Sequence, residues 1–162
     1  MNGSAGSGLY AERHFQNAYV TRDIDAAAKM FAERHGIGSF HFLRDIPFEP
    51  GATTHLALAW AGDVMIELIQ PNGAAPNLYS THLPEPGQLL RFHHLGHLIT
   101  DDASWDRIES TALRSGLPVA LHGNSYGVNY LYLDARAELG HYLEYVYLTG
   151  DAVHFFDAVP RY

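Results

Sequence analysis

The stretch Gln16-Asn-Ala-Tyr-Val-Thr-Arg-Asp23-Ile-Asp-Ala-Ala-Ala-Lys-Met-Phe-Ala-Glu-Arg-His35-Gly36 decides the fold. Its first part, up to Asp23, has the composition of a β-strand, and residues 24–35 have the composition of an α-helix. Asp23 is well placed to cap the start of that helix, and Gly36 is well placed to end it. The stretch therefore predicts a strand that leads directly into a helix.

The same pattern returns at His94-Leu-Gly-His-Leu-Ile-Thr-Asp101, which is followed by a helical stretch over 103–115 and by Gly116. In both copies the Asp follows the first polar residue of the strand by seven positions, from 16 to 23 and from 94 to 101. Three strand-like runs follow each predicted helix, with Gly and Pro between them. These runs cover roughly 38–44, 54–60 and 63–70 in the first copy, and 117–121, 130–134 and 141–147 in the second. The pattern indicates an internal duplication of a β-α-β-β-β unit.

The predicted fold class is α+β, with two paired βαβββ modules. If each module curls into a half-barrel, the pair forms a cupped, mostly antiparallel sheet around a central cavity. The expected parts of this single domain are a flexible leader over 1–13, a first module over 14–70, a linker rich in Pro and Gly over 71–91, a second module over 92–147 and a C-terminal tail over 148–162. Phe155 and Phe156 would be costly to leave in water. We therefore expect the tail to dock, either on its own chain or on a partner subunit.

The composition is that of a globular protein, with 47% hydrophobic and 17% charged residues in 162. A formal net charge of −8 argues against nucleic acid as a partner, because affinity for nucleic acid comes mainly from neutralised phosphates. No apolar run is long enough to span a membrane, and the first residues do not resemble a signal peptide. The chain has no cysteine, which excludes disulfides and thiolate chemistry. A cytoplasmic location is expected.

One glutamate interrupts the last apolar run of each copy. Glu67 follows Gln16 by 51 positions, and Glu144 follows His94 by 50. A charge in the middle of an apolar strand is expensive unless it is paired or bound to a metal. If paired modules bring their first and last strands around one cavity, Gln16, Glu67, His94 and Glu144 converge there. One imidazole, one amide oxygen and two carboxylates suit Zn, Ni, Co, Mn or Fe(II).

Two plainer interpretations of these residues remain open. A lone His or Gln in a strand is usually an ordinary polar residue, and either glutamate could pair with an arginine such as Arg91. Other histidines are weaker candidates. By strand alternation, His93 and His97 point away from the face of His94, and His141 points away from that of Glu144, so they are expected to pack or to face solvent. The remaining candidates for lining a pocket are His41, His55, His122, Tyr126, Tyr130 and Tyr132.

With these features the sequence resembles the vicinal oxygen chelate superfamily, which includes glyoxalase I, methylmalonyl-CoA epimerase, extradiol dioxygenases and bleomycin-resistance proteins. The matching segments are the two openings 16–23 and 94–101, Ile66-Glu67-Leu68-Ile69 and Gly140-His-Tyr-Leu-Glu144-Tyr. The resemblance implies metal ligands at Gln16, Glu67, His94 and Glu144. In the enzymes the first of these positions is more often histidine, so His14 is the alternative ligand to Gln16.

The resemblance implies a glyoxalase-like, metal-dependent isomerase or lyase, acting as an epimerase or a lyase on a small oxygen-chelating substrate. A divalent metal stabilises an enolate-like intermediate in such enzymes, and Glu144 or Glu67 would be the catalytic base. The alternatives are a drug-sequestering binding protein of the same fold and, third, a ring-cleaving dioxygenase. The expected partners are a small-molecule substrate and a second copy in a homodimer, with the site within one chain or across two.

Overall fold

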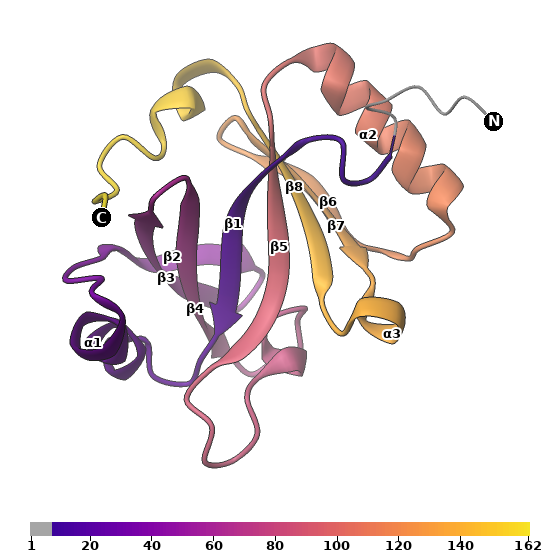
Figure 1. The fold of residues 1–162 in the computed structure, drawn as a ribbon. Coiled ribbons are helices and arrows are strands. Elements are labelled where there is room, and N and C mark those ends of the chain that lie inside the picture. The colour runs from indigo at the N-terminus through magenta and orange to yellow at the C-terminus, as the bar shows by residue number, and fades with distance from the viewer. Residues whose placement is uncertain (1–7) are drawn as a thin grey trace. The chain divides into compact units, whose positions relative to one another are not determined.

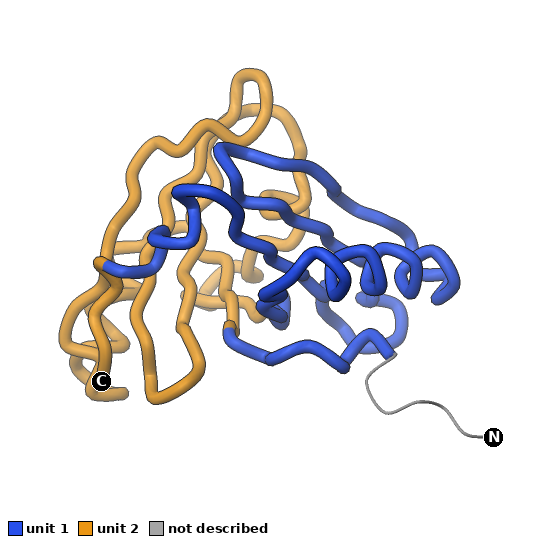
Figure 2. Tube along the Cα trace, turned by 90° about the horizontal axis from the view of Figure 1, so that it is seen from above, with its two compact units in different colours: residues 1–15, 94–157 blue, residues 16–93, 158–162 orange. Residues whose placement is uncertain are grey.

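The computed structural model of the protein describes residues 8–162, so residues 1–7 of the predicted leader lie outside the described residues. The chain divides into two compact units, which Figure 2 colours separately. Unit 1 contains residues 1–15 and 94–157, and unit 2 contains residues 16–93 and 158–162. Unit 2 therefore holds most of the first module, and unit 1 holds most of the second. Each unit is described below by itself.

Unit 2 is a sheet with one helix on one of its faces. Its elements are most of β1 (Arg13–Val20), α1 (Ile24–His35), β2 (His41–Glu49), β3 (Ala52–Ala61), β4 (Val64–Gly73), the short 3-10 helix η1 (Ser80–His82) and the first residues of β5 (Arg91–Ile99). The strand order is β2-β3-β4-β1, and the beginning of β5 follows β1. β1 and β4 are parallel, whereas β2 and β4 each pair antiparallel with β3.

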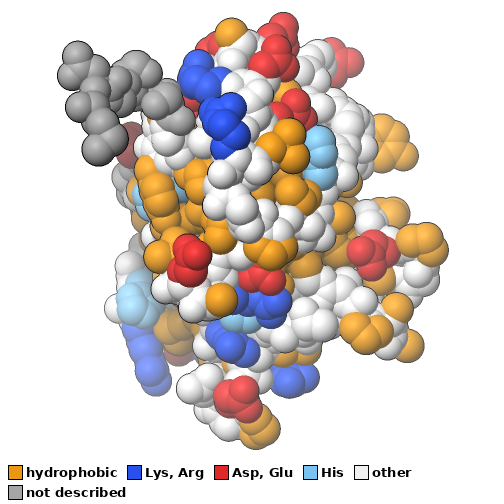
Figure 3. Space-filling model, turned by 90° about the vertical axis from the view of Figure 1, so that its right-hand side faces the viewer, with side chains coloured by type: hydrophobic (Ala, Val, Ile, Leu, Met, Phe, Trp, Pro, Cys, Tyr) orange, Lys and Arg blue, Asp and Glu red, His pale blue; other side chains and the backbone are white. Residues whose placement is uncertain are grey.

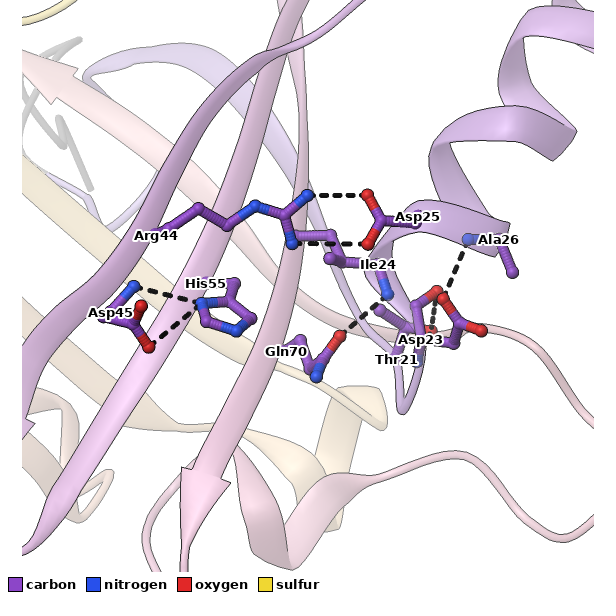
Figure 4. A network of polar contacts seen from close by, with 9 residues as sticks. All are labelled: Thr21, Asp23, Ile24, Asp25, Ala26, Arg44, Asp45, His55 and Gln70. Atoms are coloured by element: carbon purple, nitrogen blue, oxygen red, sulfur yellow. Dashed lines mark hydrogen bonds and ion pairs between the residues drawn. The ribbon is translucent and has the colours of Figure 1, made fainter.

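Helix α1 forms where the sequence predicts it. The Asp23 side chain accepts a hydrogen bond from the Ala26 amide at 2.9 Å, and Gly36 ends the helix in the left-handed conformation at φ 74° (Figure 4). The helix buries Ile24, Ala27 and Phe31 in a core cluster that also contains small and aliphatic residues of β3 and β4. Figure 1 shows α1 beside these strands. Capping and one apolar face therefore fix this helix.

The end of the chain docks on its own unit. The Trp60 amide donates to the Pro160 carbonyl at 2.8 Å, and the Tyr162 amide donates to the Trp60 carbonyl at 2.9 Å. The Ser39 and Tyr162 hydroxyls lie 2.7 Å apart. Along β3 the pairing with β2 reaches only Leu58, so residues 160–162 satisfy the backbone groups of β3 beyond that point. The last residues therefore dock on their own chain, which is one of the two outcomes that the sequence left open. Phe155, however, on which the expectation also rested, stays 40% exposed.

Unit 1 repeats this arrangement. Its elements are the main part of β5, α2 (Asp102–Ser115), β6 (Val119–Ser125), β7 (Val128–Asp134), the one-turn helix α3 (Arg136–Leu139), β8 (Tyr142–Leu148) and the 3-10 helix η2 (Gly150–His154). The strand order is β5-β8-β7-β6, with the first residues of β1 beside β5. β5 and β8 are parallel, and β7 pairs antiparallel with both β6 and β8. The α+β class and the two βαβββ modules are confirmed.

Helix α2 has the same start and stop signals as α1. The Asp101 carboxylate accepts from the Ser104 amide at 2.8 Å and from the Ser104 hydroxyl at 2.9 Å. These hydrogen bonds lower the pKa of Asp101. Gly116 ends the helix at φ 77°, and Ile108 and Ala112 face the core. No described helix combines the length and the apolar character that crossing a membrane requires.

The described part of the predicted leader is attached to unit 1. The buried Tyr145 hydroxyl donates to the Leu9 carbonyl at 2.8 Å, and Glu12 pairs with Arg107. Strand β1 begins at Arg13, three positions before Gln16. Arg13 and His14 are exposed, so the hydrophobic pattern of the sequence does not reveal this first part of the strand. Helix α3, which precedes β8, has no counterpart in the first module and was not predicted.

Candidate functional site

His94 and Glu144 lie side by side on the parallel strands β5 and β8 of unit 1. In the register of these strands His94 is opposite Tyr142, and Gly96 is opposite Glu144. His94 and Glu144 therefore belong to the same face of the sheet. The His94 Nε2 atom lies 3.0 Å from the Glu144 Oε2 atom, with His94 fully buried and only a tenth of the Glu144 side chain exposed. The predicted second-module ligands are thus in direct contact.

Tyr132 restrains this pair from the neighbouring strand β7. It is opposite Glu144 in the register of β7 and β8. Its ring meets the His94 ring edge-on, with centroids 5.2 Å apart and planes at 89°. Tyr132 is itself buried. A buried ring packed in this way limits the rotation of the imidazole, so the orientation of His94 is set before any ligand binds.

Gln16 and Glu67 occupy the equivalent positions in unit 2. On the parallel strands β1 and β4, Gln16 is opposite Met65, and Ala18 is opposite Glu67. Ala18, the partner of Glu67, follows Gln16 by two residues. Gly96, the partner of Glu144, follows His94 by two residues in the same way. Both side chains are buried, and the Gln16 Nε2 atom lies 3.7 Å from the Met65 sulfur. The duplication therefore extends to the strand register of all four predicted ligands.

His14, the alternative to Gln16, has a different environment. It is exposed, whereas Gln16 is 3% exposed. Its ring lies near the His97 ring in unit 1, with centroids 6.1 Å apart. The register repeat includes Gln16 and not His14, so Gln16 remains the better candidate ligand.

The donor atoms of the second module are close together. The His94 nitrogen and the Glu144 oxygen lie 3.0 Å apart, a distance that also forms an ion pair when His94 is protonated. Glu67, His94 and Glu144 each offer a buried nitrogen or oxygen donor. A buried group of this kind could hold a metal, and N/O donors suit the first-row ions that the sequence predicts.

His93 and His97 are buried on the other face of the sheet from His94. The His93 Nε2 atom lies 3.0 Å from the Leu78 carbonyl oxygen, and its ring packs on Tyr79. The His97 ring stacks on Tyr145 with centroids 5.3 Å apart. Burial, followed by the nearby His14, lowers the pKa of His97 to about 4. Both histidines pack, which is one of the two outcomes expected for them.

The other histidines named as possible pocket residues have local roles where the structure shows their contacts. The His55 Nδ1 atom accepts a hydrogen bond from the Asp45 amide at 3.0 Å (Figure 4). The His122 Nε2 atom lies 2.9 Å from a Glu109 carboxylate oxygen, and this pair is partly exposed. His41 is half-buried on β2.

Arg136 is not among the predicted ligands, but it contacts a residue beside them. Its Nε and Nη2 atoms donate to the two oxygens of Asp134 at 2.9 and 2.8 Å. Its guanidinium carbon lies 4.7 Å from the centre of the Tyr142 ring, and Tyr142 is the register partner of His94. Arg136 is the first residue of α3, which precedes the strand that carries Glu144.

No protein-family model matches the chain, and no curated protein sequence matches it. Solved structures do match. A variant of the methylmalonyl-CoA epimerase from Streptomyces coelicolor, in complex with 2-nitronate-propionyl-CoA, is similar over 86% of this chain and 99% of its own, with a TM-score of 0.61 and 16% identity. The methylmalonyl-CoA epimerase from Mycobacterium tuberculosis matches over 91% of this chain and 94% of its own, with a TM-score of 0.59 and 13% identity.

A third structure, of a methylmalonyl-CoA epimerase in complex with methylmalonyl-CoA and an ammonium ion, covers 86% of this chain and 96% of its own, with a TM-score of 0.58 and 16% identity. At such identities the likeness establishes the fold and leaves the activity open. The match spans nearly the full length of each relative, including both βαβββ modules. The protein has the vicinal oxygen chelate fold and is structurally similar to methylmalonyl-CoA epimerases, which are members of that superfamily.

Proposed function

We propose that this protein is a metal-dependent isomerase or lyase that removes a proton from the carbon next to a carbonyl group. The observation that carries the proposal is the buried contact between the His94 Nε2 and Glu144 Oε2 atoms at 3.0 Å. A buried carboxylate and imidazole in contact are found at many metal and catalytic centres. The equivalent register of Gln16 and Glu67 in the first module supports the same conclusion.

We propose that Gln16, Glu67, His94 and Glu144 form one ligand set for a divalent cation. Two carboxylates would balance the charge of such an ion, and the burial of all four side chains keeps competing water away. When bound, the metal would act as a Lewis acid that holds two oxygen atoms of the substrate and polarises its carbonyl group. This arrangement selects a small substrate with two neighbouring oxygens.

We assign the proton transfer to Glu67 and the role of metal ligand to Glu144. Glu144 already directs Oε2 at the His94 nitrogen, so this oxygen belongs with the imidazole. A carboxylate oxygen of Glu67 would take the proton from one face of the substrate, and an acid on the opposite face would deliver a proton to give epimerisation. His94 and Tyr132 would hold the geometry and would not exchange protons with the substrate.

The substrate class follows from this chemistry and from the structural neighbours. A thioester whose 2-position also carries a carboxylate has an acidic proton between two oxygen-bearing groups. Methylmalonyl-CoA is such a compound, and it is bound in one of the similar structures. We therefore propose 2-carboxy thioesters as the first substrates to test.

The first experiment measures the metal content of purified protein by mass spectrometry, after loading with Zn, Ni, Co, Mn or Fe(II). We expect about one ion per chain in the parent protein. His94→Ala and Glu144→Gln should lose the ion while keeping the cooperative unfolding of the parent. His122→Ala and Glu109→Gln are the matched controls, because they remove an exposed His–Glu pair from the same unit. Metal-free parent protein under all loading conditions would exclude the mechanism.

The second experiment follows exchange of the substrate α-proton for deuterium by NMR. Glu67→Gln should retain at least part of the metal and lose exchange by a factor of at least 100, the usual size for removal of a general base. Glu144→Gln should lose both. The reverse result, with exchange retained in Glu67→Gln, would move the base to Glu144.

One observation favours a second candidate, a small-molecule binding protein without chemistry. Gln16 offers a neutral amide where the enzymes of this superfamily more often have histidine, and an amide is a weak ligand for these metals. A protein that takes up no metal but binds apolar ligands would support this candidate. A ring-cleaving dioxygenase is disfavoured because His94 is the only imidazole in the proposed set, and its iron site would need a second histidine.

A further inference from the structure

Arg136 is tethered on one side and open on the other. Asp134 accepts from Nε and from Nη2, which orients the guanidinium group. A guanidinium has five N–H donors, so three remain, two on Nη1 and one on Nη2. The described residues provide no hydrogen bond to these three, and more than a third of the side chain is exposed. The group is thus held in place with one edge open.

The open edge has the geometry that recognises a carboxylate. The Nη1 and Nη2 donors on that side point in parallel, and a carboxylate accepts such a pair with both oxygens. The side-chain hydrogen bonds to Asp134 raise the pKa of Arg136, so its charge is permanent. In a chain with a formal net charge of −8, a fixed cation would attract an anionic ligand. The face of the molecule in Figure 3 shows basic side chains scattered among acidic and hydrophobic ones.

The position of Arg136 connects it to the proposed metal site. Its guanidinium group lies over the ring of Tyr142, which is 3% exposed. Tyr142 is opposite His94 in the strand register and precedes Glu144 by two residues on the same face. Tyr142 therefore contacts the Arg136 guanidinium group and is also the neighbour of His94 in the sheet.

We propose that Arg136 is a specificity residue that binds a carboxylate group of the substrate. The inference rests on the proposed function for the identity of the site and extends it by naming the anionic group that the site selects. A substrate would present its chelating oxygens, one of which belongs to its carboxylate, to the His94 and Glu144 side of the site, and the same carboxylate would accept from the open edge of Arg136. Neutral analogues that lack the carboxylate lose this interaction.

The first module contains a matched pair that serves as the control. Arg44 donates to both carboxylate oxygens of Asp25, and its guanidinium carbon lies 4.5 Å from the centre of the Phe42 ring. Figure 4 shows the two hydrogen bonds. Phe42, however, packs against the core cluster under α1 and is not beside a predicted metal ligand. Arg44 therefore has an acidic partner and a ring contact like those of Arg136, but Asp25 occupies its Nη1–Nη2 edge, which is open in Arg136.

The test is calorimetric titration of the full-length protein with malonate, which carries two carboxylates, in the metal-loaded and metal-free forms. We expect Arg136→Ala to weaken malonate binding at least tenfold in the loaded form, and Arg136→Lys to weaken it less, because lysine keeps the charge and loses the fork. Arg44→Ala should bind like the parent. Metal content and thermal unfolding are measured on the same samples to verify that each variant is folded.

Each outcome decides a separate question. The role of Arg136 is overturned if the parent, Arg136→Ala and Arg136→Lys bind malonate equally. It is also overturned if the parent binds no malonate in either form. Inorganic phosphate in a parallel titration distinguishes the anion, since equal dependence of phosphate binding on Arg136 contradicts selection of a carboxylate. A parent that takes up no metal but still binds malonate through Arg136 contradicts only the metal-dependent function and leaves the carboxylate site standing.

Discussion

Each module contributes one half-site, which consists of its two predicted ligands and the residues paired with them. The two half-sites have the same backbone arrangement and different side chains. In the first module Gln16, Met65, Glu67 and Leu58 occupy the positions that His94, Tyr142, Glu144 and Tyr132 occupy in the second. Only the glutamate is the same in both. The first half-site thus combines an amide with a thioether and an aliphatic side chain, whereas the second combines an imidazole with two aromatic rings.

This difference shows which properties a duplicated fold preserves. Parallel pairing between the first and last strands of each module fixes which residues are neighbours, so both modules place a polar residue two positions before the partner of the glutamate. Side-chain chemistry can then change in one copy without disturbing the pairing. Exchanging side chains between the copies is therefore the most direct way to test the comparison.

The largest effect is expected when the donor of one copy is moved into the other. His94→Gln makes the second half-site resemble the first and replaces a strong nitrogen donor by a neutral oxygen. We expect the affinity for zinc to fall about 100-fold, or about 2.7 kcal/mol, and Gln16→His to raise it. Competition with a chromophoric chelator measures both, with His122→Gln as the control. Unchanged affinity in His94→Gln would show that the second half-site does not dominate.

The second effect is a pH dependence that belongs to one module. The pKa of His97 is lowered to about 4 in the folded protein, from 6.5 in the unfolded chain. The unfolded state therefore binds the proton more strongly, so stability is greatest above pH 6.5 and is lost as the pH falls towards 4. At pH 5 the loss from this residue is about 2 kcal/mol. The first module has Tyr19, and not a histidine, at the matching place.

Urea unfolding at pH 7 and pH 5 measures this loss in the parent and in His97→Phe, which keeps an aromatic ring against Tyr145. The variant should lose less stability than the parent between the two pH values. An equal loss in both would assign the acid sensitivity to other groups.

A third, smaller effect concerns the ring beside His94. Tyr132→Leu gives the second half-site the side chain that Leu58 supplies in the first. Removing this support for the imidazole should weaken metal binding about tenfold, as for other residues that orient metal ligands. Tyr130→Leu on the same strand is the control, because Tyr130 pairs with Val146 and not with Glu144. Competition titrations that rank the two variants equally would remove Tyr132 from the site.

The smallest effect compares the two helix caps. Asp23→Ala should lower the free energy of unfolding by about 1 kcal/mol, the usual value for an N-cap. Asp101→Ala should lower it more, because Asp101 accepts from both the amide and the hydroxyl of Ser104, whereas Asp23 accepts from one amide. Thermal unfolding of the two variants tests this order. Equal melting temperatures would mean that the hydroxyl contact contributes nothing.

The sequence was informative where the signal is local. The capping residues predicted both long helices to within one residue, because capping depends on a few adjacent positions. These residues are Asp23 and Gly36 for α1, and Asp101 and Gly116 for α2. Strand ends were less accurate. β1 begins at Arg13 and β2 extends to Glu49, since exposed polar residues at strand ends interrupt the hydrophobic pattern.

The candidate site was predictable in part for the same reason. Gln16, Glu67, His94 and Glu144 could be named because a polar residue in an apolar strand is costly and because the cost recurs at matching positions. The role that we propose for Arg136 could not be predicted. Its role depends on the turn of α3 and on a contact with the Tyr142 ring, and neither leaves a periodic trace in the sequence.

The sequence by itself determined the duplication, the two helices, the α+β class and the polar residues of both half-sites, because each follows from the spacing of residues along one chain. The tertiary structure alone decided the parallel pairing of β5 with β8, and with it the 3.0 Å contact between His94 and Glu144. It also decided the docking of residues 160–162 on Trp60. These features join residues that lie far apart in the chain, and packing between strands determines such contacts, which local sequence preference cannot specify.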